Sequence, residues 1–297
     1  MATEPALQAR DGLVTPNPPM ILQPAPRNIG LSPSYVIGSL RNHKAIVLQM
    51  AKRDMIERYR GSIFGLLWSL FNPILMLLVY TFVFSVVFRV KWPGSDGGSL
   101  EYGVNSFAGM IVFSLFSESL SRAPSLVLQN ANLVKKVVFP LEVLPWVTLA
   151  SSLFHVLVNY IVLLGFVLFI KGSLAPTVIL FPLVIVPVAL LALGLSWFLS
   201  SIGVFFRDMS HTVALLVSVW MFASPIFYPL SAVPPGIRRF LELNPLAPLI
   251  DDARSVALLG VIPELSGYLW ICAISAAVAW AGLWWFMRTK HTFADVL

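Results

Sequence analysis

The sequence predicts an all-α integral membrane protein with six transmembrane helices, an N-terminal amphipathic interface helix and short re-entrant helices before the last span. Hydrophobic residues make up 58% of the 297 residues and charged residues only 11%, far from the composition of soluble proteins. The apolar residues gather in runs of about 20 or more, the length that an α-helix needs to cross a bilayer. An outer-membrane barrel would instead show alternating segments of about ten residues.

The chain divides into a tail and a membrane domain. Residues 1–34 are rich in proline and have little apolar periodicity, which predicts a flexible tail. Residues 35–297 form the transmembrane domain: an interface helix (35–60), six spans between residues 63 and 287, and a C-terminal tail (288–297). The predicted spans are Ile63–Phe88, Val104–Val127, Leu144–Ile170, Thr177–Phe206, Thr212–Tyr228 and Gly267–Met287. Because no signal peptide is visible before it, we expect the first span to act as the insertion signal.

The placement of Lys and Arg predicts that both termini lie in the cytoplasm. With the N-terminus inside, the cytoplasmic segments carry more Lys and Arg than the outer loops, even without the tail. The opposite topology stays open, since the last outer loop is itself basic. The net charge of +6 is accounted for by this topology and by anionic lipid, so we expect no nucleic-acid partner.

The segment 35–60 mixes apolar residues with Lys and Arg, as helices that lie in the membrane interface do. A lead-in that only fixes topology is the simpler interpretation. The functional interpretation is an entrance for an anionic lipid headgroup, because a guanidinium donates two hydrogen bonds to a diphosphate at once. The candidate cations are Arg53, Arg58 and Arg60.

The second cytoplasmic segment, QNANLVKKVVFPLEVLP from Gln129 to Pro145, predicts a short amphipathic helix that ends at Pro140. Its apolar face needs a cover, either from neighbouring helices of the same chain or from a groove on a partner subunit.

Between the fifth and sixth predicted spans, two helical pieces, Pro235–Leu243 and Leu246–Leu259, are separated by Asn244 and Pro245. Neither piece is long enough to cross the bilayer. Short apolar segments interrupted by proline indicate interfacial or re-entrant helices on the outer face. A structural cap without gating motion is the alternative.

Polar and aromatic residues within the spans are further candidates. Glu118 and Arg122 lie four residues apart, which predicts a self-neutralised pair, with contact to a moving polar substrate as the alternative. His155 and Asn159 are expected to form interhelical hydrogen bonds. Among many aromatic residues that pack against lipid or helices, some could line a channel and stack on sugar rings. The predicted channel-lining residues are Tyr80, Phe84 and Trp220.

The sequence contains no phosphate-binding loop of the form G-x-x-x-x-G-K-[ST], so uphill transport would need an ATPase in another subunit. We predict no catalytic residues, no metal site and no cofactor in this chain. The single cysteine, Cys272, is expected to be a packing residue. A membrane enzyme acting on polyprenyl lipids is a weaker alternative. Acid–base chemistry would need clustered acidic or histidine residues, and the best acidic cluster in this chain, Asp251 and Asp252, has no histidine close in sequence.

The segment from Arg53 to Pro73, RDMIERYRGSIFGLLWSLFNP, resembles the start of the membrane subunit of polysaccharide-exporting ABC transporters. The resemblance covers about residues 35–297, with the Asn-Pro-Leu step at Asn244 and the C-terminal RTKHTFADVL most similar to the O-antigen exporters. It implies a six-span permease of the bacterial inner membrane that forms a homodimer and pairs with two ATPase subunits, which bind Mg-ATP. The implied cargo is polyprenyl-diphosphate-linked polysaccharide; a capsule polymer, a teichoic acid or a lipo-oligosaccharide remains an alternative.

The resemblance also implies roles for two sets of residues. The residues expected to couple the chain to its ATPase are Leu133, Lys135, Lys136, Phe139, Pro140 and Glu142. The residues expected to form an outer gate are Pro225, Tyr228, Asn244, Pro245 and Arg254. The proline-rich tail is longer than in the family.

Overall fold

The computed structural model describes residues 34–60, 62, 64–90, 92, 98–136 and 139–297, without the side chains of Tyr59, Leu66, Ser99, Lys135 and Lys136. The chain divides into two units, residues 1–30 and 31–297, and all described residues belong to the second. The predicted tail therefore lies outside the described residues, apart from Ser34.

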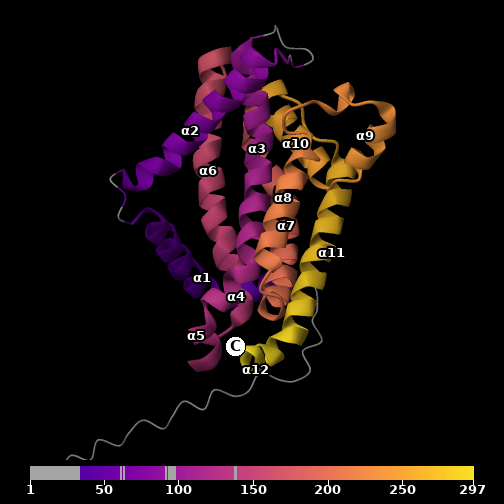
Figure 1. The fold of residues 1–297 in the computed structure, drawn as a ribbon. Helices are drawn as coiled ribbons and strands as arrows, with labels where there is room; N and C mark the ends of the chain where they lie inside the picture. The colour runs from indigo at the N-terminus through magenta and orange to yellow at the C-terminus, as the bar shows by residue number, and fades with distance from the viewer. Residues whose placement is uncertain (1–33, 61, 63, 91, 93–97, 137–138) are drawn as a thin grey trace, which may run out of the picture. The chain divides into compact units, whose positions relative to one another are not determined.

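The regular elements of the described residues are helical (Figure 1). The longer helices are α1 (Tyr35–Tyr59), α2 (Trp68–Tyr80), α3 (Ser99–Arg122), α6 (Leu144–Lys171), α7 (Phe181–Phe205), α8 (Met209–Phe222) and α11 (Leu265–Thr289). A π-helical segment, Thr81–Val87, continues α2, and a second one, Ser255–Leu259, follows α10. The short helices are α4 (Leu126–Gln129), α5 (Ala131–Lys136), α9 (Pro235–Glu242), α10 (Leu246–Arg254) and α12 (Phe293–Val296). Short 3-10 segments are Gly65–Leu67, Ala123–Ser125, Leu141–Val143, Pro176–Leu180, Leu230–Ala232 and Lys290–Thr292.

Five helical segments of the described chain are long and apolar enough to cross a membrane, which confirms the predicted membrane-protein class. They are Trp68–Val87, Leu100–Gln129, Leu141–Lys171, Pro176–Phe205 and Leu265–Val296. The predicted fifth span, Thr212–Tyr228, is helical only as far as Phe222. Its helix α8 has 14 residues and a length of about 21 Å, short of the roughly 30 Å hydrocarbon core. The first predicted span begins its α-helix at Trp68, five residues later than expected.

Two sets of contacts identify the two ends of the helical bundle. At one end, Lys171 and Thr177, which flank the α6–α7 connection, donate hydrogen bonds of 2.5 and 2.7 Å to the carbonyls of Leu258 and Val256. At the other end, Lys290 lies 3.4 Å from Glu142, which joins the end of α11 to the start of α6. Helix α8 therefore leads from the Glu142 end, where α7 finishes, toward the end that carries α9 and α10 (Figure 1).

Helices α7 and α11 approach each other through glycine. A Cβ atom on Gly282 would lie 2.0 Å from the carbonyl oxygen of Gly194, and one on Gly194 would lie 2.4 Å from that of Val278. Small residues allow such close backbone contact, which is a main source of helix association in membranes. Trp197 of α7 is fully buried, and its indole NH donates a 3.0 Å hydrogen bond to the carbonyl of Glu142.

Candidate functional site

Helix α1 is held against α3 and α6 by apolar and ionic contacts. Val47 and Ala51, one helical turn apart, are buried against Val143 and Val147. Near the end of the helix, Arg122 of α3 donates two hydrogen bonds to Asp54, of 2.5 and 2.9 Å. Burial disfavours the ionised carboxylate, but the bonds and charge of Arg122 prevail and hold the pKa of Asp54 below its ordinary value.

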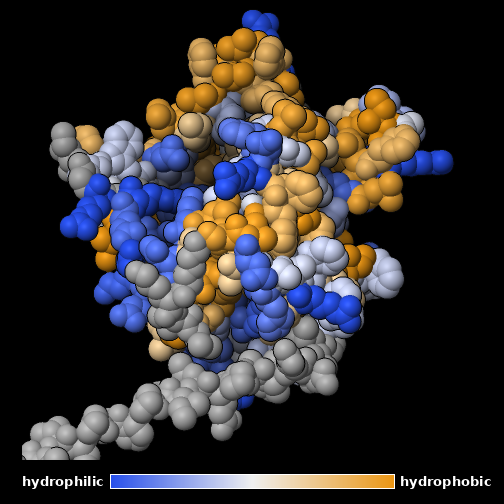
Figure 2. Space-filling model, turned by 60° about the horizontal axis from the view of Figure 1, so that its bottom comes forward, coloured by the Kyte–Doolittle hydropathy of each residue, from blue (hydrophilic) through white to orange (hydrophobic). Residues whose placement is uncertain are grey.

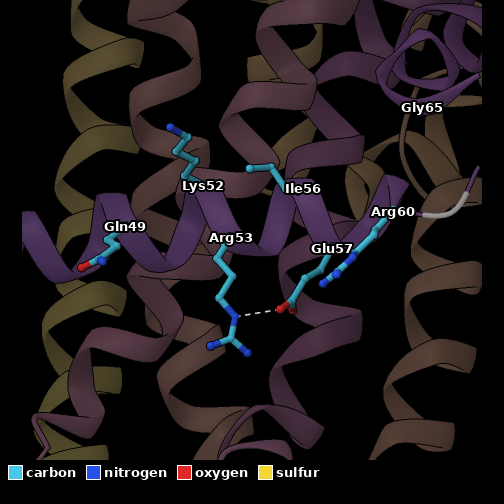
Figure 3. A pocket seen from close by; sticks show the side chains of 7 residues that line it. All are labelled: Gln49, Lys52, Arg53, Ile56, Glu57, Arg60 and Gly65. Atoms are coloured by element: carbon cyan, nitrogen blue, oxygen red, sulfur yellow. Dashed lines mark hydrogen bonds and ion pairs between the residues drawn. The ribbon is translucent and has the colours of Figure 1, made fainter.

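The outward side of α1 forms a basic cavity of about 620 Å³, lined by Gln49, Lys52, Arg53, Ile56, Glu57, Arg60 and Gly65. Figure 3 shows Arg53, Glu57 and Arg60 converging on one side of the helix. Arg53 pairs with Glu57 at 2.7 Å, but both side chains are more than half exposed. Because exposed pairs of this kind contribute little energy, Arg53 can exchange Glu57 for an anionic ligand. Arg53 and Arg60, two of the three predicted entrance cations, thus share one cavity.

Arg58, the third predicted cation, points elsewhere and is already paired. Its guanidinium lies 2.6 Å from Glu118 of α3 and 3.1 Å from His155 of α6. Glu118 in turn lies 3.0 Å from His155, which is the kind of interhelical contact expected of this histidine. The predicted Glu118–Arg122 pair is present at 4.0 Å, but each of the two groups has a closer partner from α1. Sequence spacing within α3 gave no sign of those partners.

Beside this junction lies a polar cavity of about 380 Å³. Its lining residues are Arg58, Trp68, Ser69, Asn72, Pro73, Ser114, Glu118, His155 and Asn159. They come from the end of α1, the start of α2, and the facing sides of α3 and α6. The predicted interhelical hydrogen bond of Asn159 is not formed within the part of the chain that the structure describes.

The predicted coupling segment lies at the end of the bundle that carries α12 (Figure 1). Leu133 and Phe139 line a third cavity, of about 520 Å³, and Phe139 also packs against the Val47 cluster. Pro140 precedes the 3-10 segment Leu141–Val143. Hydrophilic side chains gather on this end around an apolar area (Figure 2). The side chains of Lys135 and Lys136 lie outside the described residues.

Glu142 of the coupling set differs from the rest because it is only 4% exposed. Its carboxylate contacts Lys290 of the same chain, so it lies within the protomer and joins the coupling segment to the C-terminus. The C-terminal helix α12 is held there by Phe293, which is fully buried against Phe205 and Phe286.

At the opposite end, the chain leaves α8 in an irregular segment, residues 223–228, whose carbonyls are hydrogen-bonded by side chains. Tyr228 donates to the carbonyl of Phe222 (2.7 Å), and Asn244 donates to that of Ala223 (3.2 Å). Tyr102 of α3 donates to the carbonyl of Phe227 (2.6 Å). The carbonyls of Phe222, Ala223 and Phe227 thus have side-chain partners where the helix ends.

Arg254 completes this set. The side chain is 3% exposed, and its guanidinium donates to the carbonyls of Pro225 (2.5 Å) and Ile226 (2.7 Å). It also donates to the carbonyl of Asn105 (3.0 Å) and to Asp251 (2.9 Å). Burial lowers the pKa of Arg254 to about 10, so it remains a cation at neutral pH.

The predicted gate residues therefore meet at one place. Asn244 accepts hydrogen bonds from the indole of Trp220 and from the backbone NH of Leu246, both at 3.0 Å, which ties α8 to α10 across Pro245. Sequence reasoning missed Tyr102, because a tyrosine near a helix start reads as an ordinary interfacial aromatic residue.

The three predicted channel-lining residues all contact residues 223–228 or a side chain that bonds to them. The rings of Tyr80 and Phe84 lie 5.1 and 4.7 Å from that of Phe227. Trp220 packs at 5.1 Å against Phe116 in addition to its bond with Asn244. Their role in a channel stays a prediction.

Long apolar helices, the basic helix α1 at one end and hydrogen-bonded short helices at the other define a multi-pass α-helical membrane protein. More particularly, the chain belongs to the ABC-2 type transporter family, whose sequence pattern matches residues 46–258. It is 30% identical over 264 residues to the O-antigen export system permease protein RfbA of Myxococcus xanthus, covering 88% of this chain and 98% of that protein. A protein of the same name from Klebsiella pneumoniae is 28% identical over 91% of this chain and all of its own. The polysialic acid transport protein KpsM of Escherichia coli is 23% identical over 74% of this chain and 84% of its own. The resemblance stated from the sequence is confirmed.

Proposed function

We propose that this protein is the transmembrane permease subunit of an ATP-driven exporter that moves polyprenyl-diphosphate-linked O-antigen polysaccharide out of the cytoplasm across the bacterial inner membrane. The observation that carries the proposal is the match to O-antigen permeases over 98% or more of their length. In this proposal the permease forms a homodimer. Two separate ATPase subunits, which hold Mg-ATP, supply the energy, since this chain has no phosphate-binding loop.

The proposed topology has six membrane crossings, re-entrant helices α9 and α10 on the outer side, and both termini in the cytoplasm. Three contacts support it: Glu142 with Lys290, which brings the C-terminus back to the start of α6, and Lys171 and Thr177 with the segment after α10. Helix α8 and the irregular residues 223–228 together make the fifth crossing. Irregular backbone is tolerated at membrane depth when its polar groups are hydrogen-bonded within the protein, as carbonyls of this segment are.

In the proposed path, the lipid diphosphate approaches the basic cavity on α1, and the glycan passes the aromatic residues of the interior. Arg53, Lys52 and Arg60 favour an anionic headgroup there. The α5 segment with Phe139 is the proposed docking point for the ATPase, at the same end as α1.

The first test is depletion of this protein in its native cells. The expected result is loss of surface O-antigen and accumulation of polyprenyl-linked polysaccharide inside, measured by gel electrophoresis of cell-surface and cytoplasmic fractions. Unchanged O-antigen with loss of capsule would instead support the capsular alternative, which the weaker KpsM match favours. Purification in mild detergent with mass spectrometry should recover an ATPase in near-stoichiometric amounts. Its absence would contradict the two-component exporter.

A further inference from the structure

The polar cavity beside α1 contains two amides that the protein itself does not use. Asn72 of α2 and Asn159 of α6 both line it, and neither side-chain amide forms a hydrogen bond with any residue that the structure describes. Both lie within segments long and apolar enough to cross the membrane. Amides at that depth are costly unless a polar group binds them, so the cavity is built to hold water or a polar ligand.

Arg58 and Glu118 form an ion pair in this cavity. Arg58 is the only Lys or Arg among the described lining residues; its guanidinium lies 2.6 Å from the carboxylate of Glu118, and His155 lies 3.0 Å from the same carboxylate. A diphosphate placed here would face that carboxylate, and like charges in close contact are unfavourable. The ligand that fits is therefore neutral and rich in both donors and acceptors.

The remaining lining groups suit a sugar ring. Each asparagine offers two donors and one acceptor oxygen, which matches the hydroxyl groups of a pyranose. Trp68, which is 45% exposed, adds an aromatic face on which a ring can stack. A volume of about 380 Å³ lies at the lower end of small-molecule pockets and is suited to a ligand of this size.

The two cavities border the same connection between α1 and α2. Arg60 and Gly65 line the basic cavity, and Arg58 and Trp68 line the polar one. A diphosphate at the first and a sugar attached to it at the second would thus both lie beside residues that flank this one short connection.

We infer that the polar cavity is a specificity subsite for the sugar directly attached to the lipid diphosphate, with Asn72 and Asn159 as its hydrogen-bonding residues. This inference rests on the proposed function. It assigns diphosphate binding to the basic cavity and sugar recognition to the polar cavity.

The test measures equilibrium binding of two synthetic probes to the full-length protein in lipid nanodiscs. One probe is polyprenyl diphosphate carrying a single N-acetylglucosamine, and the other is the same polyprenyl diphosphate without a sugar. Asn72→Leu and Asn159→Leu remove the amides at nearly constant volume and leave no protein group without a partner, so both variants are expected to fold. Asn159→Ala provides a smaller second variant, and Leu157→Ala, on the exposed side of the same helix, is the control.

The wild type should bind the sugar-bearing probe more tightly than the bare one. Each Asn→Leu variant should weaken binding of the sugar-bearing probe about three- to ten-fold, the effect of losing one or two hydrogen bonds, and leave the bare probe unchanged. Leu157→Ala should change neither affinity, whereas Lys52→Gln combined with Arg60→Gln should weaken both probes alike.

Equal binding of both probes by the wild type, or asparagine variants that affect both probes equally or neither, would overturn the sugar subsite and leave the proposed function standing. If the wild type binds neither probe, the proposed lipid-diphosphate cargo fails, and the subsite inference fails with it.

Discussion

At the residue scale, Arg254 donates hydrogen bonds to four acceptors at once, which a lysine cannot do in the same geometry. Its planar guanidinium serves three backbone carbonyls and one carboxylate in a buried site. Arg254→Lys should leave some of these groups unsatisfied and lower the free energy of unfolding by about 2–4 kcal/mol. Thermal unfolding in detergent measures this loss. Arg239→Lys, at an exposed position of α9, is the matched control. Equal melting temperatures for Arg254→Lys and wild type would show that the guanidinium is not needed there.

Asp252 makes stability depend on pH. Burial, aided by the charge of Asp251, raises the pKa of Asp252 to about 6, from about 4 in an unfolded chain. Between these values the folded state holds a proton that the unfolded state has lost, so stability falls as pH rises through this window and levels off above it. Asp252→Asn removes this effect.

The Asp252→Asn variant should therefore melt at a higher temperature than wild type at pH 7.5 and at a similar temperature at pH 4. Asp295→Asn, at an exposed position of α12, is the control and should show no such pH-dependent difference. A gain that is the same at both pH values would point to packing rather than ionisation.

At the scale of elements, the sequence predicted the long helices and a helix over residues 35–60 with small errors at their ends. It did not predict that α8 stops at Phe222, because apolar sequence continues through Ile226 and Phe227. The helix ends where side chains from distant elements, such as Tyr102 and Arg254, supply the hydrogen bonds that a helix would otherwise make internally. Local spacing likewise could not predict the principal partner of Glu118, because Arg58 lies on another helix.

The close packing of α7 against α11 should depend on the glycines at their contact, Gly194 and Gly282. Gly282→Ala would place a methyl group 2.0 Å from a backbone oxygen, so the helices must separate. We expect a loss of several kcal/mol, on the order of 2–5, as for other changes that disrupt a packed core. Gly165→Ala in α6 is the control, because nothing lies within 4 Å of its added Cβ atom. That variant should be neutral or up to about 1 kcal/mol more stable. Similar stability of both variants would contradict the close approach.

The attachment of α1 to the bundle should respond to charge exchange. Asp54→Arg alone should place two cations together and release the end of α1, seen as faster amide hydrogen exchange in residues 50–58. Adding Arg122→Asp should restore much of the protection, because the pair is re-formed in reverse. Arg53→Asp with Glu57→Arg, an exposed pair on the same helix, should change exchange little. Failure of the double exchange to recover any protection would show that the Asp54–Arg122 pair is not what holds the end of α1.

At the scale of the whole molecule, the contacts of α12 and Glu142 place the C-terminus beside the coupling segment, which the sequence did not foretell. The family resemblance implied that Glu142 couples the chain to its ATPase. The burial of Glu142 under Lys290 means that any movement of the segment Leu141–Val143 is shared with the end of α11. Local sequence could not indicate this, because Glu142 and Lys290 are 148 residues apart.

The proposed topology of the whole chain places residues 236 and 132 on opposite sides of the membrane. Replacing Cys272 by serine gives a cysteine-free background, since it is the only cysteine. Gly236→Cys places a thiol in α9, where an added Cβ atom meets nothing within 4 Å, and Asn132→Cys places one at an exposed position of α5. With α8 completing a crossing, a membrane-impermeant maleimide should label residue 236 in intact spheroplasts and residue 132 only after permeabilisation. The reverse pattern would invert the topology, and labelling of both from one side would mean that α8 does not carry the chain across.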